Sequence, residues 1–216
     1  MIVPRYKGPV GEWSFEGGPI RQLNWSTLES CLVWCDIVIS VISSYGLLVP
    51  KIIHLSQWMR AGSSEVSKSE RVEKGAVTLP IDSGQGFKGV FSKCYALMTL
   101  ESVYPLTIEI FGSGKIVKRS SYDVVDDLVW IRSTTLEILR ISILTQSDVW
   151  LPYSLRAEPQ HEICTRNADR LASALEEVKI RTGFKLEAGL ETYYSVIKGF
   201  HLENIRYSDG SIADLS

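Results

Sequence analysis

The 216-residue sequence has little excess of charge of either sign. Its 23 Lys and Arg residues nearly balance its 25 Asp and Glu residues, and the formal net charge is −2 at pH 7. Such a chain has no basic field to hold a phosphate backbone, and it gains little from an anionic membrane surface. We therefore expect neither a nucleic-acid partner nor a membrane partner.

Residues that ligate metals or act as nucleophiles are also scarce. The chain has only 3 His, far apart in the sequence, and 4 Cys. Cys31 and Cys35 are four residues apart on an expected helix, while Cys94 and Cys164 are remote, so the spacing of a zinc site is absent. We interpret the cysteines as buried free thiols and expect no metal and no cofactor. The first residues lack the layout of a signal peptide, so we expect a reducing, cytoplasmic setting.

One long apolar run, residues 31–49, is about the length that spans a bilayer. It contains Asp36, whose charge is costly near the centre of a membrane. Asp36, Ser40, Ser43 and Ser44 fall on one side of a helix, which makes the run amphipathic. The pattern therefore favours a core helix over a membrane span.

Alternation of apolar and polar residues predicts strands in the second half of the chain. Residues 136–144 place three apolar side chains on one face: Leu139, Ile141 and Ile143. Residues 128–132 predict a partner strand, joined to the first by a polar link at 133–135. Residues 148–153 contain Pro152, which lacks an N–H group, so this segment is either an edge strand or leaves the sheet.

Three further segments, residues 10–15, 76–79 and 106–111, also read as strands. In the last of these, apolar residues alternate with Thr and Glu. The glycine-rich residues 112–114 then predict the turn of a hairpin that returns along residues 115–119. We expect these strands to join the same antiparallel sheet.

Residues 167–182 predict an amphipathic helix. Its apolar residues recur at helical spacing: Ala168, Leu171, Ala172, Leu175 and Val178. Asn167 or Thr165 can cap its start, and Gly183 stands where a left-handed residue closes a helix. This segment carries the strongest local helix signal in the chain.

A second helix is expected over residues 26–45. Ser26 and Glu29 form a capping-box pattern at its start, and Gly46 ends it. Its inner face would consist of Leu28, Leu32, Cys35, Ile39 and Ile42. Residues 51–60 are apolar and predict a further short helix.

These segments predict an α+β fold, in which an antiparallel sheet meander carries helices packed on one face. The sheet is expected mainly within residues 76–153, and the helices within residues 26–61 and 167–182. We expect a single domain over residues 1–216.

Within that domain, a helical N-terminal part at residues 1–62 is expected to precede a loop at residues 63–75, where apolar content falls abruptly. A sheet-plus-helix part would follow at residues 76–216. The small polar residues after Asn204 are expected to fray.

Two patterns are tested for catalytic or cofactor chemistry. His161, Glu162 and Cys164 lie within four residues, and a Cys–His pair can act as a nucleophile when a third group orients the base. No such group is evident, so we expect no catalytic residue there. Gly84, Gly86 and Gly89 have the spacing of a dinucleotide fingerprint, but the antiparallel pattern that follows them favours a flexible loop.

The expected partner-binding residues are acidic and aromatic. Asp123, Asp126 and Asp127 form an acidic group that we place in a turn between strands, suited to a basic partner. Further candidates are the aromatic residues on neighbouring segments: Trp130, Trp150 and Tyr153. If exposed, these rings would serve as interface anchors, although core packing is the more common role of tryptophan.

Residues 148–153, 156–160 and 167–172 together resemble a segment of small bacterial proteins that are similar to immunity proteins of polymorphic toxin systems. The resemblance implies a bacterial cytoplasmic protein that neutralises a secreted toxin domain by binding it, with no catalytic residues. A non-enzymatic binding protein is therefore the leading hypothesis. The alternatives are a small hydrolase or transferase using His161 and Cys164 or the Asp123 to Asp127 carboxylates, and a structural subunit that forms a homo-oligomer.

Overall fold

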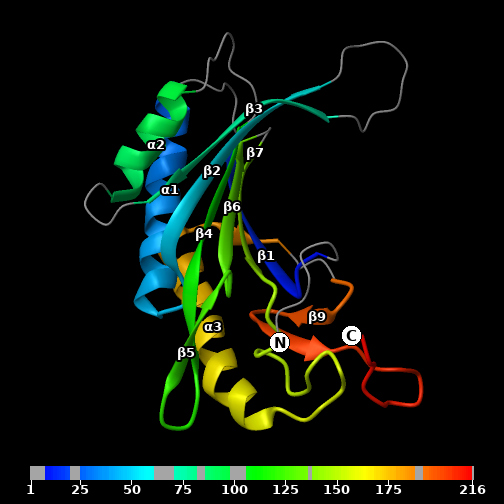
Figure 1. The fold of residues 1–216 in the computed structure, drawn as a ribbon. Coiled ribbons are helices and arrows are strands. Elements are labelled where there is room, and N and C mark those ends of the chain that lie inside the picture. Colours follow the sequence, from blue (N-terminus) through cyan, green and yellow to red (C-terminus); the bar gives the residue numbers. More distant parts are fainter. Residues whose placement is uncertain are drawn as a thin grey trace, which may run out of the picture.

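The computed structural model describes residues 8–19, 25–60, 71–81, 86–97, 106–135, 138–187 and 192–215 (Figure 1). Its helices are α1 (Trp25–Ser44), α2 (Gly86–Leu97) and α3 (His161–Thr182). Its strands are β1 (Gly11–Pro19), β2 (Val49–Arg60), β3 (Arg71–Pro80), β4 (Leu106–Val117), β5 (Tyr122–Asp126), β6 (Trp130–Thr135), β7 (Ile138–Thr145), β8 (Lys185–Leu186), β9 (Ser195–Lys198) and β10 (His201–Asn204).

An 8-stranded sheet has the order β3-β2-β4-β6-β7-β1-β8, with β5 paired to β4 beside this path. Among the described strands, each pairing is antiparallel. The predicted α+β fold is confirmed, and β4 to β7 form the expected meander. Because β3 and β4 both run antiparallel to β2, they are parallel to each other, and α2 makes the crossover between them.

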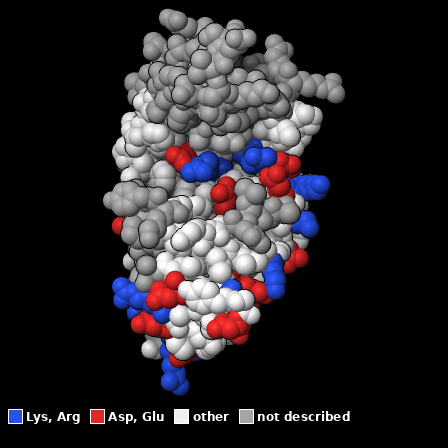
Figure 2. Space-filling view, turned by 90° about the vertical axis from the view of Figure 1, so that its right-hand side faces the viewer, with Lys and Arg blue, Asp and Glu red and all other residues white. Residues whose placement is uncertain are grey.

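The helices lie on one side of the large sheet, where α1 and α2 stand next to each other (Figure 1). On the side of the molecule away from them, the described Lys and Arg side chains are interspersed with Asp and Glu (Figure 2). We call the sheet surface that turns away from the helices the helix-free face. Among the described helices, none combines the length and the apolar content that crossing a bilayer requires.

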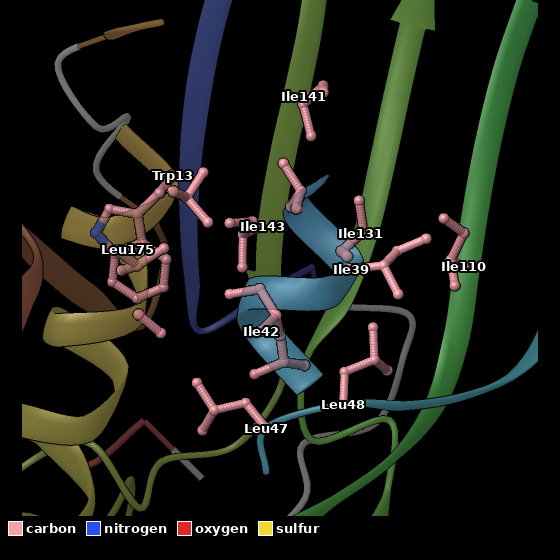
Figure 3. Packing of buried hydrophobic residues seen from close by; sticks show 14 of the residues in the cluster. Trp13, Ile39, Ile42, Leu47, Leu48, Ile110, Ile131, Ile141, Ile143 and Leu175 are labelled. Carbon is pink, nitrogen blue, oxygen red and sulfur yellow. The ribbon is translucent and has the colours of Figure 1, made fainter. Parts of the chain in front are cut away.

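The core lies between the sheet and the helices. Figure 3 shows α1 placed over the strands, with α3 beside it. The residues that meet there are buried and include Trp13, Ile39, Ile42, Ile131, Ile141, Ile143 and Leu175. The predicted inner face of α1 is confirmed where its side chains are described, and so is the alternation in β7, because Leu139 is buried while Arg140 is exposed. Burial of these apolar groups is the main favourable contribution to folding.

The predicted helix at residues 51–60 is wrong, because this segment belongs to β2. Ile53 and Leu55 are fully buried on the core face, and His54 between them points to the other face, so the period is two. The expected boundary at residues 63–75 is also wrong in part, because β3 already includes residues 71–75. Strands of the sheet, β2 and β3, therefore precede and follow this segment in the sequence.

The predicted turn at residues 112–114 is wrong as well, since β4 continues straight through it. A Cβ on Gly112 would lie 2.0 Å from the Val49 carbonyl oxygen, and one on Gly114 would lie 2.2 Å from the Leu47 carbonyl oxygen. These glycines therefore allow the backbone at the start of β2 and just before it to approach β4 closely. The actual hairpin turn joins Val117 to Tyr122.

Helix α3 has the predicted apolar face and ends at Gly183, whose φ of 67° is left-handed as predicted. It begins at His161, however, six residues before the predicted start, so neither Thr165 nor Asn167 caps it. The Asn167 side chain is buried within the helix and bonds the backbone of Val117 in β4.

Other boundaries differ at the ends of β6 and β7. Residues 133–135 belong to β6 instead of forming a link. Residues 148–153 leave the sheet, which is one of the two expected outcomes. The expected fraying after Asn204 is wrong, because Ala213 is buried and the Leu215 N–H donates to the Leu155 carbonyl at 2.7 Å.

Candidate site on the helix-free face

The three aspartates of the expected acidic turn are not all in a turn. Asp123 and Asp126 lie on β5, and only Asp127 follows it, with a positive φ of 54°. Asp123 forms an ion pair with Lys118, and Asp126 pairs with Lys51 at 2.7 Å. Two of the three charges are therefore neutralised by nearby lysines, so this group carries less net negative charge than its sequence indicates.

The expected aromatic anchors are largely unavailable to a partner. Trp150 is only 1% exposed, and its ring N–H donates to the hydroxyl of Thr145 at 2.9 Å. Trp130 is 6% exposed, although its edge reaches the helix-free face. Tyr153 is half-buried and packs edge-on against His161. Trp150 is thus a core residue, and Tyr153 lies outside the group formed by Asp126, Asp127 and Trp130.

A row of polar side chains crosses the helix-free face from β3 to β1. Strand register places its members opposite one another in the order Thr78, His54, Glu109, Arg132, Ser142 and Ser14. Several neighbours are bonded: His54 Nδ1 to Thr78 Oγ1 at 2.8 Å, and Arg132 Nε to Glu109 Oε1 at 2.9 Å. Sequence reasoning missed this row, because its members come together only through the register of remote strands.

A second, apolar group lies next to the polar row. Ile52 stands opposite Phe111, and the ring of Phe111 stacks on that of Trp130 with centroids 6.5 Å apart. Ile52 is 41% exposed despite its size. Binding of a partner that removes such apolar surface from water is favourable in free energy.

Two adjoining hollows open over these groups. The larger, about 540 Å³, is lined by Lys51, Ile52, His54, Thr78, Glu109, Phe111, Gly112, Asp126 and Asp127. The smaller, about 230 Å³, is lined by Gly8, Pro9, Glu109, Phe111, Asp127, Trp130, Arg132 and Gln146. They share Glu109, Phe111 and Asp127, so we treat them as one feature and call it the sheet groove. Three of the six predicted partner-binding residues line it.

Two carboxylates of the sheet groove are held by cations that also line it. Glu109 is bound by Arg132, and Asp126 is bound by Lys51. Within the described residues, no group of three or more His, Cys, Asp or Glu side chains is arranged to hold a metal ion. The groove therefore combines exposed apolar surface with charges of both signs.

His161 and Cys164 lie at the start of α3, outside the groove. The Cys164 thiol donates to the carbonyl oxygen of Trp150 at 3.3 Å, while the His161 ring packs on Tyr153. Burial raises the pKa of the Cys164 thiol, and the carboxylate of Asp169 raises it further. A nucleophilic cysteine requires the opposite shift.

We predict that Cys164 reacts slowly with iodoacetamide. Because its pKa is raised, the thiolate fraction at pH 8 is below that of free cysteine, and the rate continues to rise at higher pH. Mass spectrometry of the peptide that contains Cys164 measures the rate, and a Cys164→Ser variant identifies the adduct. A rate equal to that of free cysteine, or faster, would contradict the assignment of an inert thiol.

Of the glycine pattern at Gly84, Gly86 and Gly89, residues 82–85 lie outside the described part of the chain, and Gly86 and Gly89 belong to α2.

Comparison with protein-family models, with curated proteins and with solved structures gives no match. The functional argument therefore depends on the groove itself.

Proposed function

We propose that the chain is a non-enzymatic binding protein that holds a protein partner in the sheet groove. The observation that supports this proposal is the groove's composition, in which Ile52 and Phe111 form an apolar wall between charged pairs. Interfaces commonly place such an apolar centre inside a polar rim. We further propose that the partner is a bacterial toxin domain and that binding takes place in the cytoplasm, as the resemblance to immunity proteins implies.

The ion pairing of the groove's carboxylates supports binding over catalysis. Glu109 and Asp126 each accept a hydrogen bond from a cation on another strand of the sheet. A general base needs a carboxylate oxygen that is free to take a proton from a substrate, whereas these two carboxylates are engaged by cations. Such pairs are instead suited to orienting a partner, because surface charges contribute more to specificity and association rate than to affinity.

A growth assay tests this proposal. The chain is co-expressed in bacteria with any secreted toxin domain that is encoded beside its gene, and we expect it to restore growth. Ile52→Glu should abolish protection, since it places a charge in the apolar wall. Ile180→Glu is the matched control, because Ile180 is 73% exposed on α3, away from the sheet. Equal protection by both variants would place the binding surface elsewhere, and loss of growth with the unmodified chain would count against the toxin-neutralising role.

A further inference from the structure

We infer that two copies of this chain associate through β5, whose free edge pairs with the same edge of the second copy. Strand β5 forms the second arm of the β4–β5 hairpin, which extends from the end of the sheet (Figure 1). In the described part of the chain, β5 pairs with β4 alone. An unpaired edge of this kind is a template for another strand.

The backbone groups on this edge can be assigned from the hairpin's hydrogen bonds. The Lys118 N–H donates to the Ser121 carbonyl, and the Asp127 N–H donates to the Gly112 carbonyl. In an antiparallel ladder, bonded pairs recur at every second residue, so the backbone of residues 123 and 125 faces β4. The N–H and C=O groups of Tyr122, Val124 and Asp126 therefore point away from β4.

Apolar side chains lie exposed along the same edge, next to Asp123 and Asp126. Tyr122 is 55% exposed and Val124 is 61% exposed. Val49, also exposed, lies on the same face, because register pairs it with Ser113, which in turn pairs with Asp126. Burying these apolar side chains against a second copy would remove them from water.

Charge selects one register for this association. In a pair centred on Val124, Val124 faces its own copy, Tyr122 faces Asp126, and Asp123 faces Val125. A pair centred on residue 123 would set Asp123 opposite Asp123, and one centred on residue 125 would set Asp123 opposite Asp127. Opposed like charges are destabilising, so the register centred on Val124 is favoured over these two.

The same register adds a favourable contact. The ammonium group of Lys115 lies 4.5 Å from the centroid of the Tyr122 ring. Since Tyr122 faces Asp126 of the second copy, that carboxylate comes close to Lys115. The two-fold symmetry repeats this contact, as is usual for an isologous dimer.

The contact is small, because β5 has only five residues. Interfaces well below about 1,200 Å² belong to weak, reversible complexes. We therefore expect a dissociation constant on the order of tens of micromolar, so that dimers form in concentrated solution and separate on dilution.

Cysteine cross-linking tests both the association and its register. Facing residues of a bonded pair have Cα atoms about 5.5 Å apart, which is within reach of a disulfide. Under mild oxidation, Val124→Cys should form a covalent dimer. Tyr122→Cys alone and Asp126→Cys alone should not, but a mixture of the two should. The unmodified chain, treated in the same way, measures any background from its own cysteines.

Sedimentation velocity of the unmodified chain, from about 5 to about 300 µM, is the second measurement. We expect a monomer–dimer equilibrium that Val124→Lys abolishes and that Ile52→Glu leaves intact. Ile52→Glu thereby separates self-association from partner binding in the sheet groove. A chain that stays monomeric over the whole range overturns the inference, and so does a dimer that Val124→Lys does not weaken.

Discussion

Replacing Gly112 by alanine should lower the free energy of unfolding by on the order of 3 kcal/mol or more. The new methyl group would lie 2.0 Å from the Val49 carbonyl oxygen and 3.0 Å from a methyl carbon of Leu48. Backbone cannot yield as a flexible side chain does, so β2 and β4 must separate at their junction. Urea unfolding, followed by tryptophan fluorescence, measures the loss.

Gly18→Ala provides the matched control for this prediction. Gly18 is exposed on β1, and a Cβ there meets no heavy atom within 4 Å. We expect its stability to change by no more than about 0.5 kcal/mol. If Gly112→Ala were as stable as Gly18→Ala, the close approach of the two backbones would be refuted.

Asn167→Leu should cost about 3 kcal/mol, because it removes a clamp between α3 and the edge of β4. The Asn167 carboxamide accepts a hydrogen bond from the Val117 N–H and donates one to the Val117 carbonyl, each at 2.9 Å. It also donates to the Ile163 carbonyl and accepts from Arg170. Leucine has a similar volume but cannot satisfy these groups, so the partly buried N–H and C=O of Val117 lose their partners.

Two measurements check the prediction for Asn167. Urea unfolding gives the loss of stability, and amide hydrogen exchange reports directly on the Val117 N–H. Ser173→Ala, an exposed substitution on the same helix, is the control and should change neither. Unchanged protection of the Val117 amide in Asn167→Leu would contradict the proposed clamp.

The elements that the sequence predicts correctly are those whose signal is local. The apolar spacing of α3 and the glycine that closes it lie within one segment, and so does the alternation in β7. Each pattern follows from the geometry of the element itself. The fold class could therefore be derived from a few clear segments.

The errors arise where remote partners decide the structure. The apolar run of residues 51–60 fits a helix until β3 and β4 pair with it on both sides. Glycines at 112 and 114 suggest a turn. Their lack of a side chain instead leaves room for a backbone segment that lies more than 60 residues earlier in the chain. Asn167 has the character of a cap, but its partner is Val117, in another element.

The residues of the candidate site also divide into those with a local sequence signal and those brought together by remote strands. Asp126, Asp127 and Trp130 could be predicted, because acidic and aromatic residues stand close together in the sequence. Ile52 and Glu109 could not, since strand register alone brings them beside the others. A period of two at residues 52–55 was the available signal, and with it β2 could have been recognised as a strand.

The most direct test of the account is the affinity of the chain for the proposed partner, a bacterial toxin domain, measured by calorimetry for three proteins. We expect Ile52→Glu to raise the dissociation constant by on the order of 100-fold relative to the unmodified chain, as substitution of a central interface residue does. Ile180→Glu should stay within about twofold, which corresponds to less than 0.5 kcal/mol. Identical affinities for all three proteins would contradict the claim that the sheet groove binds the partner.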